Sequence, residues 1–266
     1  MRIVNRISGI EGIVAGGSPT FKLPGNRRYH GLKLFTTASG VAAAVTAVID
    51  RIALVVGGVT IRDVSTTRLL ALSTLNGYTP ATGELPIVFS EPARADKIDE
   101  QVTAWDMIGE GAFEVRLQIA AGATLPGVTG IAMFDYGQTL LNGKPVKNVI
   151  RITELTKNAV SGLNDFDNLP MCDPIQRIVL FAAGAINSVE VTADRNKVYE
   201  VTSAENARVL ADYGLVGSAA AFPICFDFTE QITDALVIAR DLNVRFDSAA
   251  AQAVTAVVEA RAPAFI

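Results

Sequence analysis

The chain has 266 residues, of which 50% are hydrophobic and 19% are charged, and its formal net charge is −4. This length suits one large domain or two of ordinary size, and the apolar fraction is on the high side for a solitary soluble monomer. The acidic balance does not support a basic nucleic-acid-binding face, so we expect no direct binding to nucleic acid.

The start of the chain predicts an arm followed by short strands. Residues 1–18 are rich in glycine, with isolated apolar residues between, and we expect an N-terminal arm there rather than a core element. Residues 20–23 are predicted to form a strand that ends at Pro24, and residues 32–35 alternate as a second strand.

Residues 52–89 recur at 189–226, with every position shifted by 137. In both copies, alternating apolar residues flank a short turn, at residues 57–58 and 194–195, as in a β-hairpin. Chance similarity rarely keeps a turn, a helix cap, a helix end and a proline in register together. We therefore infer an internal duplication.

A helix is predicted after each hairpin. Ser65 and Thr202 suit its N-cap, and Thr202 with Glu205 has the spacing of a capping box. Gly77 and Gly214 suit the left-handed position just beyond a helix end. The apolar residues at helical spacing are Leu69, Leu72 and Leu75 in the first copy and Val209, Leu210 and Tyr213 in the second.

The repeat extends to both sides of this unit. Residues 23–35 return at 169–181 with a shift of 146, so the first copy holds nine additional residues, which we place in the alanine-rich segment 38–47. A polar loop is predicted at residues 91–101. The later strands that return are 114–117 at 243–246 and 128–129 at 254–255.

These elements predict an all-β protein with two tandem eight-stranded antiparallel jelly rolls, a double jelly roll, each with a short inserted helix. Short strands without intervening helices favour an antiparallel sandwich over a parallel α/β sheet. The predicted boundaries are an N-terminal arm at 1–18, a first jelly roll at 19–136, a linker at 137–146 and a second jelly roll at 147–266.

The sequence does not predict export or membrane insertion. The N-terminus lacks the apolar core of a signal peptide, and the longest apolar run, 41–56, contains Asp50 and Arg51 and is too short to span a bilayer. Cys172 and Cys225 are expected to be free thiols. We therefore expect synthesis and folding in a reducing cytoplasm.

Catalytic chemistry has little support in the sequence. His30 is the only histidine, and a metal-binding cupin needs several clustered histidines, so a double cupin is not expected. We predict that His30 lies in a loop and has a structural role. Neither a dinucleotide fingerprint nor a P-loop motif occurs. We predict no catalytic residues, no cofactor-binding residues and no enzymatic activity.

One loop has the chemistry of a structural metal site. Residues 164–168 place several side-chain oxygens close together, and Asp165 and Asp167 are candidate ligands for Ca²⁺. The segment lacks the glycine and the distant glutamate of an EF-hand loop, and loops rich in Asp and Asn are commonly turns. A calcium site and a plain turn are therefore alternatives.

Several segments together resemble the major capsid protein of the corticoviruses, which are icosahedral bacteriophages with an internal membrane. The segments are residues 20–24, residues 29–35, the hairpin and capped helix that begin at residue 52, and the strand pair within 242–259. The resemblance extends over nearly the whole chain. It implies two jelly rolls in each subunit and a pseudo-hexagonal homotrimer that tiles an icosahedral shell over a membrane, so we expect a protein of the virion capsid.

The resemblance also implies partners. They are other copies of the chain in the trimer and lattice, a vertex penton protein, minor capsid or membrane proteins, and the internal lipid membrane. We expect the membrane close to the N-terminal arm, where Arg2 and Arg6 would meet anionic headgroups. The resemblance further implies Ca²⁺ as a structural ion. The alanine-rich insert and the glycine-rich arm are departures from the family pattern.

Two other functions are alternatives. A secreted glycan-processing amidase can also have two tandem jelly rolls, but the lack of a signal peptide counts against it. A carbohydrate-binding module or a fibre protein usually presents a strip of exposed aromatic residues. Here aromatic residues make up only 7% of the chain and mostly occupy predicted strand positions.

Overall fold

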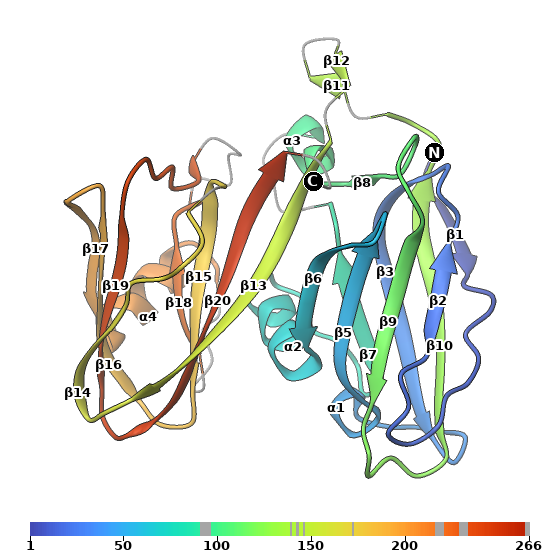
Figure 1. Cartoon of the computed structure of the whole chain (residues 1–266), viewed down its shortest axis with the longest axis horizontal. Helices are drawn as coiled ribbons and strands as arrows, with labels where there is room; N and C mark the ends of the chain where they lie inside the picture. The colour runs from blue at the N-terminus through green and yellow to red at the C-terminus, as the bar shows by residue number, and fades with distance from the viewer. Residues whose placement is uncertain are drawn as a thin grey trace. The chain divides into compact units, whose positions relative to one another are not determined.

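The computed structural model describes residues 1–90, 97–138, 140–141, 144–145, 147–171, 173–215, 221–228 and 234–263 (Figure 1). The chain divides into two compact units. The first comprises Met1–Thr74, Tyr78–Ile150 and Pro263–Ile266, and the second comprises Leu75–Gly77 and Arg151–Ala262.

Two antiparallel sheets build the described part of the first unit. In one sheet, β3 (Arg28–Ala38) pairs with β10 (Pro126–Asp135), and β1 (Ile3–Arg6) pairs with the other edge of β10. The strands β4 (Val41–Ala42), β7 (Glu84–Val88) and β8 (Trp105–Asp106) also pair with β3. The other sheet contains, in order, β6 (Val59–Ser65), β5 (Ile49–Val56), β9 (Phe113–Ile119) and β2 (Thr20–Leu23).

Side-chain alternation along these strands produces the core of the first unit. The residues of β9 that are buried are Phe113, Val115, Leu117 and Ile119, every second residue of the strand. Aromatic rings fill the interior: Phe89 stacks on Trp105 with a centroid distance of 4.4 Å, and Tyr29 meets Phe113 edge-on at 5.4 Å.

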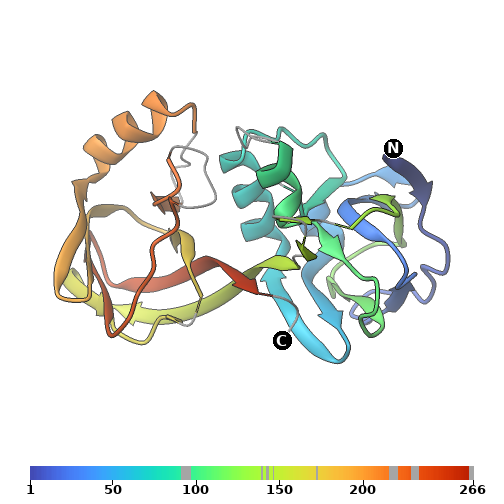
Figure 2. The ribbon, with the colours of Figure 1, turned by 90° about the horizontal axis from the view of Figure 1, so that it is seen from above.

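In the described part of the first half of the chain, three short helices lie between strands. They are α1 (Val45–Val48), α2 (Thr66–Leu75) and α3 (Lys97–Val102). Helix α2 follows β6 directly, and Figure 2 shows it from above. Its predicted apolar stripe of Leu69, Leu72 and Leu75 is buried.

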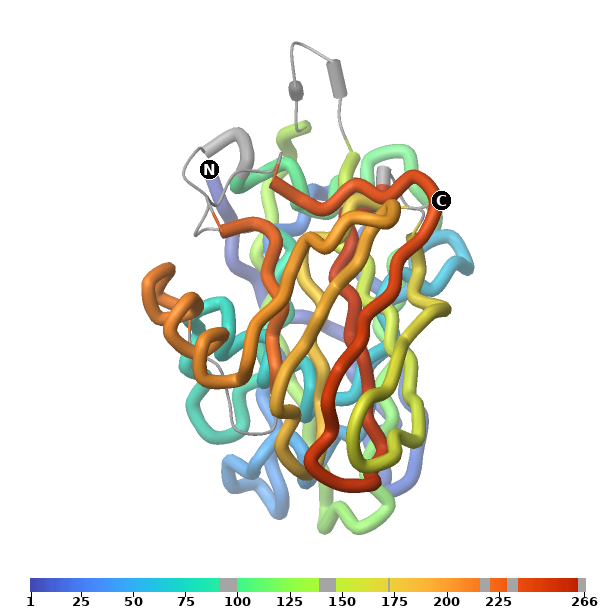
Figure 3. Tube along the Cα trace, turned by 90° about the vertical axis from the view of Figure 1, so that its left-hand side faces the viewer, coloured from blue at the N-terminus to red at the C-terminus, as the bar shows by residue number. Residues whose placement is uncertain are grey.

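The second unit repeats this arrangement. One sheet contains, in order, β18 (Ala221–Cys225), β15 (Ile175–Ala182), β20 (Gln252–Pro263) and β13 (Asn148–Ala159). The other contains β17 (Asn196–Thr202), β16 (Ile186–Ala193), β19 (Leu242–Ser248) and β14 (Gly162–Phe166), with α4 (Ser203–Asp212) after β17 (Figure 3). The unit has its own core, in which Phe166 stacks on Phe246.

Each strand of the second unit has a counterpart in the first, which has β4 and β8 in addition, and the predicted double jelly roll is confirmed. The hairpin β5–β6 and the hairpin β16–β17 each contain a bulge at the equivalent place, directly after Leu54 and directly after Val191. Both turns have the positive φ angles of a type I′ hairpin. These angles are 57° at Gly57, 88° at Gly58, 49° at Asp194 and 68° at Arg195.

The predicted capping box at the start of α4 is present. Thr202 Oγ1 accepts a hydrogen bond from Glu205 N at 3.3 Å, and Glu205 Oε2 accepts one from Thr202 N at 2.8 Å. Leu210 is buried, as predicted, but Tyr213 is exposed. The helix ends before Tyr213, whose ring stacks on Phe228 instead of packing into the core.

Several predicted loops contain regular structure. The predicted arm, residues 1–18, contributes the largely exposed edge strand β1. The predicted loop at 91–101 is wrong in its later part, which forms α3, and residues 91–96 lie outside the described part of the chain. The alanine-rich segment contains β4 and α1. The predicted linker at 137–146 contains the hairpin of β11 (Leu140–Leu141) and β12 (Lys144–Pro145).

Among the described residues, no helix is long and apolar enough to cross a membrane. Cys225 is a buried free thiol in β18, as predicted, and its burial raises its pKa to about 12. Cys172 lies outside the described residues.

Candidate functional site

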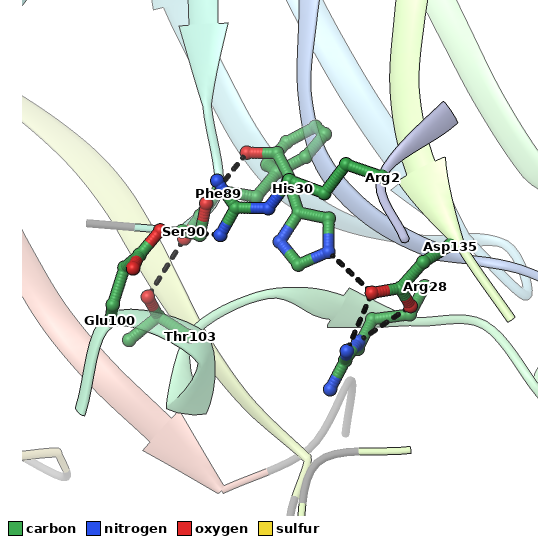
Figure 4. Close-up of polar contacts among 8 residues, drawn as sticks. All are labelled: Arg2, Arg28, His30, Phe89, Ser90, Glu100, Thr103 and Asp135. Atoms are coloured by element: carbon green, nitrogen blue, oxygen red, sulfur yellow. Dashed lines mark hydrogen bonds and ion pairs between the residues drawn. The ribbon is translucent and has the colours of Figure 1, made fainter. Parts of the chain in front are cut away.

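A buried polar cluster lies where β3 begins and β10 ends in the first unit (Figure 4). Arg28 and His30 come from the start of β3, and Asp135 is the last residue of β10. Arg28 Nε and Nη2 donate to Asp135 Oδ1 and Oδ2 at 2.9 and 2.6 Å. His30 Nε2 lies 3.0 Å from Asp135 Oδ2. One carboxylate therefore ties two side chains of β3 to the end of β10.

Burial sets the charge state of this cluster. Burial lowers the pKa of His30, so the imidazole is neutral at pH 7. We assign its proton to Nε2, which then donates to Asp135. Burial by itself raises the pKa of Asp135, but hydrogen bonds from Arg28, His30 and Gly137 N outweigh it and hold that pKa well below its ordinary 3.8. The cluster is thus an ion pair with a neutral third donor.

The backbone of His30 joins the cluster to the next strand. Phe89 N and Ser90 N both donate to His30 O at 3.0 Å, and Thr103 Oγ1 donates to Phe89 O at 2.8 Å. These bonds anchor the end of β7 and the residue after α3 (Figure 4). Arg2, just before β1, pairs with Glu100 of α3.

The second unit also has a buried arginine–carboxylate pair. Arg177 of β15 lies 3.2 Å from Asp227 and 3.9 Å from Glu259 of β20. The side chains of Asp227 and Glu259 are only 3% and 10% exposed. Asp227 follows β18, so the closer pair joins β15 to the end of β18, and only the longer contact with Glu259 joins β15 to β20, the counterparts of β3 and β10.

The geometry of the cluster at Asp135 suits a structural role. A carboxylate that two or more donors keep ionised is a poor proton acceptor at neutral pH, because a general base works best with a pKa near the working pH. In the described part of the chain, no group of three or more His, Cys, Asp or Glu side chains is arranged to hold a metal ion.

Asp165 and Asp167, the predicted calcium ligands, do not form a calcium site by themselves. Asp165 lies in β14 instead of a loop, and its Oδ1 accepts a hydrogen bond from Arg245 Nε at 3.0 Å. Asp167 follows the strand and is exposed. Calcium takes six to eight oxygen ligands, and a guanidinium beside one of the two carboxylates opposes its binding. Within one chain, the two residues therefore do not supply a full set of calcium ligands.

Sequence reasoning predicted a structural role for His30 but placed it in a loop, and it did not single out Asp135. His30 lies in β3 and is only 3% exposed. The alternation of residues along the strand was a signal that could have placed His30 in β3. Arg28 and His30 precede Leu32 and Leu34 at alternate positions, as in one face of a strand. No local signal connects these residues to Asp135, which comes 105 residues after His30.

The paired jelly rolls define a double jelly-roll protein, and the buried polar clusters hold its strands in place. The profile of the viral coat protein P2 N-terminal domain matches residues 4–137, and the profile of the P2 C-terminal domain matches residues 149–263. The chain belongs to the viral coat protein P2 family. No protein with a curated description matches the sequence.

Solved structures of capsid proteins have the same fold. The major capsid protein P2 of bacteriophage PM2 is 20% identical with a TM-score of 0.89, and the match covers 99% of this chain and 98% of that one. The major capsid protein of STIV is 13% identical with a TM-score of 0.73, over 100% and 98% of the two chains. VP54 of PBCV-1 is 9% identical with a TM-score of 0.67, over 98% and 94%.

Membership of this family makes the chain a major capsid protein and a component of the virion capsid. The family consists of structural coat proteins, so the chain is not an enzyme. The alternatives of a glycan-processing amidase and a carbohydrate-binding module have no support among these matches. A coat protein builds its shell by association with further copies of itself.

Proposed function

We propose that three copies of the chain form a pseudo-hexagonal homotrimer, and that these trimers tile an icosahedral shell over an internal membrane. The observation that carries this proposal is the structural repeat, because three chains with two similar units each supply six similar units to a ring. The high apolar content of 50% also fits a chain that buries a subunit interface in addition to two cores.

The first test is the mass of the purified protein in solution, measured by light scattering behind a sizing column. The subunit mass is 28.1 kDa, and we expect a particle of three times this mass. A monomer at every concentration would contradict the proposal, because the chain would then bury no subunit interface.

We further propose that, in the shell, the chain contacts a vertex penton protein, minor capsid or membrane proteins, and the internal lipid membrane. Synthesis would take place in the host cytoplasm. The N-terminal arm would lie close to the membrane, where Arg2 and Arg6 attract anionic headgroups.

A flotation assay with vesicles that contain anionic lipid tests the membrane contact. The double substitution Arg2→Gln and Arg6→Gln should reduce the bound fraction, because it removes two positive charges from the arm. Arg208→Gln removes an exposed charge from α4 and serves as the matched control. Equal flotation of both variants would contradict a membrane contact of the arm.

A further inference from the structure

The two units differ at one edge of their second sheets. The first residues of β13, up to Ile150, belong to the first unit, where β13 follows β6 in the strand order and Arg62 Nε of β6 donates to Ile150 O at 2.8 Å. In the second unit, the counterpart of β6 is β17, which is the last strand of its sheet among the described residues (Figure 3). The repeat therefore has a covered edge in one unit and an uncovered edge in the other.

Burial reflects this difference position by position. Ile61 of β6 is 3% exposed and Val64 is 1% exposed. Val198, the counterpart of Ile61 in β17, is 40% exposed, and Val201, the counterpart of Val64, is half-buried. An edge strand with exposed apolar residues is a template for pairing with another chain.

The strand that covers β6 also has a counterpart. Strand β13 is the neighbour of β20 in its sheet, and β1 is the neighbour of β10, the counterpart of β20. The first residues of β13 are buried, with Val149 at 0% and Ile150 at 5% exposure. In β1, by contrast, Val4 is 57% exposed, and β1 is the last strand of its sheet among the described residues.

The hydrogen bonds of β1 show which groups point away from β10. Ile7 N donates to Gly130 O, so Ile7 and Gly130 are a hydrogen-bonded pair of the antiparallel ladder. Such pairs alternate along the strand, which places Ile3 and Asn5 toward β10. The N–H and C=O groups of Val4 and Arg6 therefore point toward the outer edge.

We propose that β1 of one subunit pairs with β17 of the next subunit, and so repeats between chains the pairing of β13 with β6. Each chain then contributes β1 as one edge and β17 as the other, which makes the contact head-to-tail. A head-to-tail contact closes into a ring when the rotation between neighbours suits a closed number of copies, and the proposed trimer sets that number at three. This proposal rests on the proposed trimer and assigns the strands that hold it together.

The bulge in the second hairpin limits where β1 can pair. It lies between Val191 and Thr192 of β16, opposite the turn end of β17, and it leaves Tyr199 to Thr202 as the regular part of that strand. In the first unit, the corresponding part of β6 begins at Arg62, the residue that donates to β13. The expected contact on β17 is therefore residues 199–202.

Val4→Pro tests the contact, because proline lacks the N–H group that Val4 directs outward. Proline is tolerated on an edge strand at such a position, so the ladder with β10 should persist. Val4→Thr retains the N–H and is the matched control. We expect wild type and Val4→Thr to form the trimer, and Val4→Pro to associate at least about tenfold more weakly, which corresponds to about 1.4 kcal/mol.

The outcomes separate the two proposals. If Val4→Pro forms the trimer as the wild type does, β1 is not the contact strand, whereas the trimer itself stands. If the wild type is a monomer at every concentration, the trimer and the strand pairing are both wrong. Far-UV circular dichroism shows whether each variant keeps its β structure.

A photo-crosslink gives an independent readout in a chain that keeps its fold. A benzophenone side chain at position 4 should couple to a peptide that contains residues 199–202 of another chain, and mass spectrometry identifies the site. The same side chain at Val160, which is 63% exposed in the second unit, is the control and should not label β17. Coupling of position 4 to a different part of the partner would overturn the proposal.

Discussion

Asp135 accepts hydrogen bonds from both Arg28 and His30, so the loss of its charge affects two buried partners at once. We expect Asp135→Asn to lower the free energy of unfolding by about 3 kcal/mol, because it leaves the Arg28 charge buried without its counterion. The measurement is denaturant unfolding of the purified protein.

The control for this variant is Asp165→Asn. Asp165 and Arg245 also form an ion pair, but their side chains are 40% and 48% exposed. The cost should stay below about 1 kcal/mol, because water screens the pair. Equal effects of the two substitutions would show that the cluster at Asp135 does not behave as a buried ion pair.

The same residues make stability depend on pH. The folded-state pKa values of His30 and Asp135 are both lowered from their ordinary 6.5 and 3.8. The unfolded chain therefore binds more protons in acid, and each group's contribution is complete above its ordinary pKa and is lost as the pH falls through the folded value. The His30 contribution should decline below pH 6.5 and the Asp135 contribution below pH 3.8.

Unfolding midpoints measured across this range check the prediction. His30→Gln should remove the decline that begins below pH 6.5. The stability difference between wild type and Asp135→Asn should shrink in strong acid. A difference that stays constant down to the lowest pH would contradict the assignment of Asp135.

At the scale of single elements, the capping box of α4 makes a clear target. Thr202→Ala removes the hydroxyl that accepts from Glu205 N, and we expect a loss of about 1 kcal/mol in the free energy of unfolding. Ser203→Ala, at the next position, which is also exposed, is the control and should change little. A similar loss in both would show that the cap is unimportant.

In the hairpin turn of the second unit, Arg195 occupies a backbone position that suits glycine better. Arg195 has φ of 68°, and its counterpart is Gly58. A left-handed conformation costs a side chain about 1–2 kcal/mol, and the added flexibility of glycine offsets part of this. Arg195→Gly should therefore raise the free energy of unfolding by about 0.5 kcal/mol, as measured by denaturant unfolding.

Asp194→Gly is the matched comparison in the same turn. The Asp194 carboxylate accepts hydrogen bonds from Ala239 N, Arg240 N and Asp241 N. Its removal should destabilise the protein, because these donors lose their partner. Stabilisation by both substitutions would contradict the role of the carboxylate.

Elements with a strong local signal could be predicted from the sequence, and those that depend on distant residues could not. The duplicated hairpins, the capping box and the buried stripe of α2 follow from turn residues, caps and periodicity. Helix α3 was missed because its polar sequence has no apolar stripe. Tyr213 continued the periodic pattern of α4, but it lies beyond the helix end. The pairing of His30 with Asp135 requires the fold itself.

At the scale of the whole molecule, calcium in the lattice stays a prediction. The geometry at Asp165 and Asp167 lacks a full ligand set, so an ion there would need oxygen atoms from a neighbouring subunit. A calcium chelator added before light scattering should then shift the trimer or larger assemblies toward smaller mass, and Asp167→Asn should mimic it. An unchanged mass with chelator would contradict a structural role for calcium in the assembly.

The shared position of the bulge in both hairpins has a consequence for the history of the chain. Bulge, turn and helix coincide at a constant spacing of 137 residues, so they were already present in the single jelly roll that was duplicated. In the proposed ring of three chains, the pairing of β13 with β6 lies within each chain and the pairing of β1 with β17 lies between chains. The duplication would therefore halve the number of contacts that separate molecules must form.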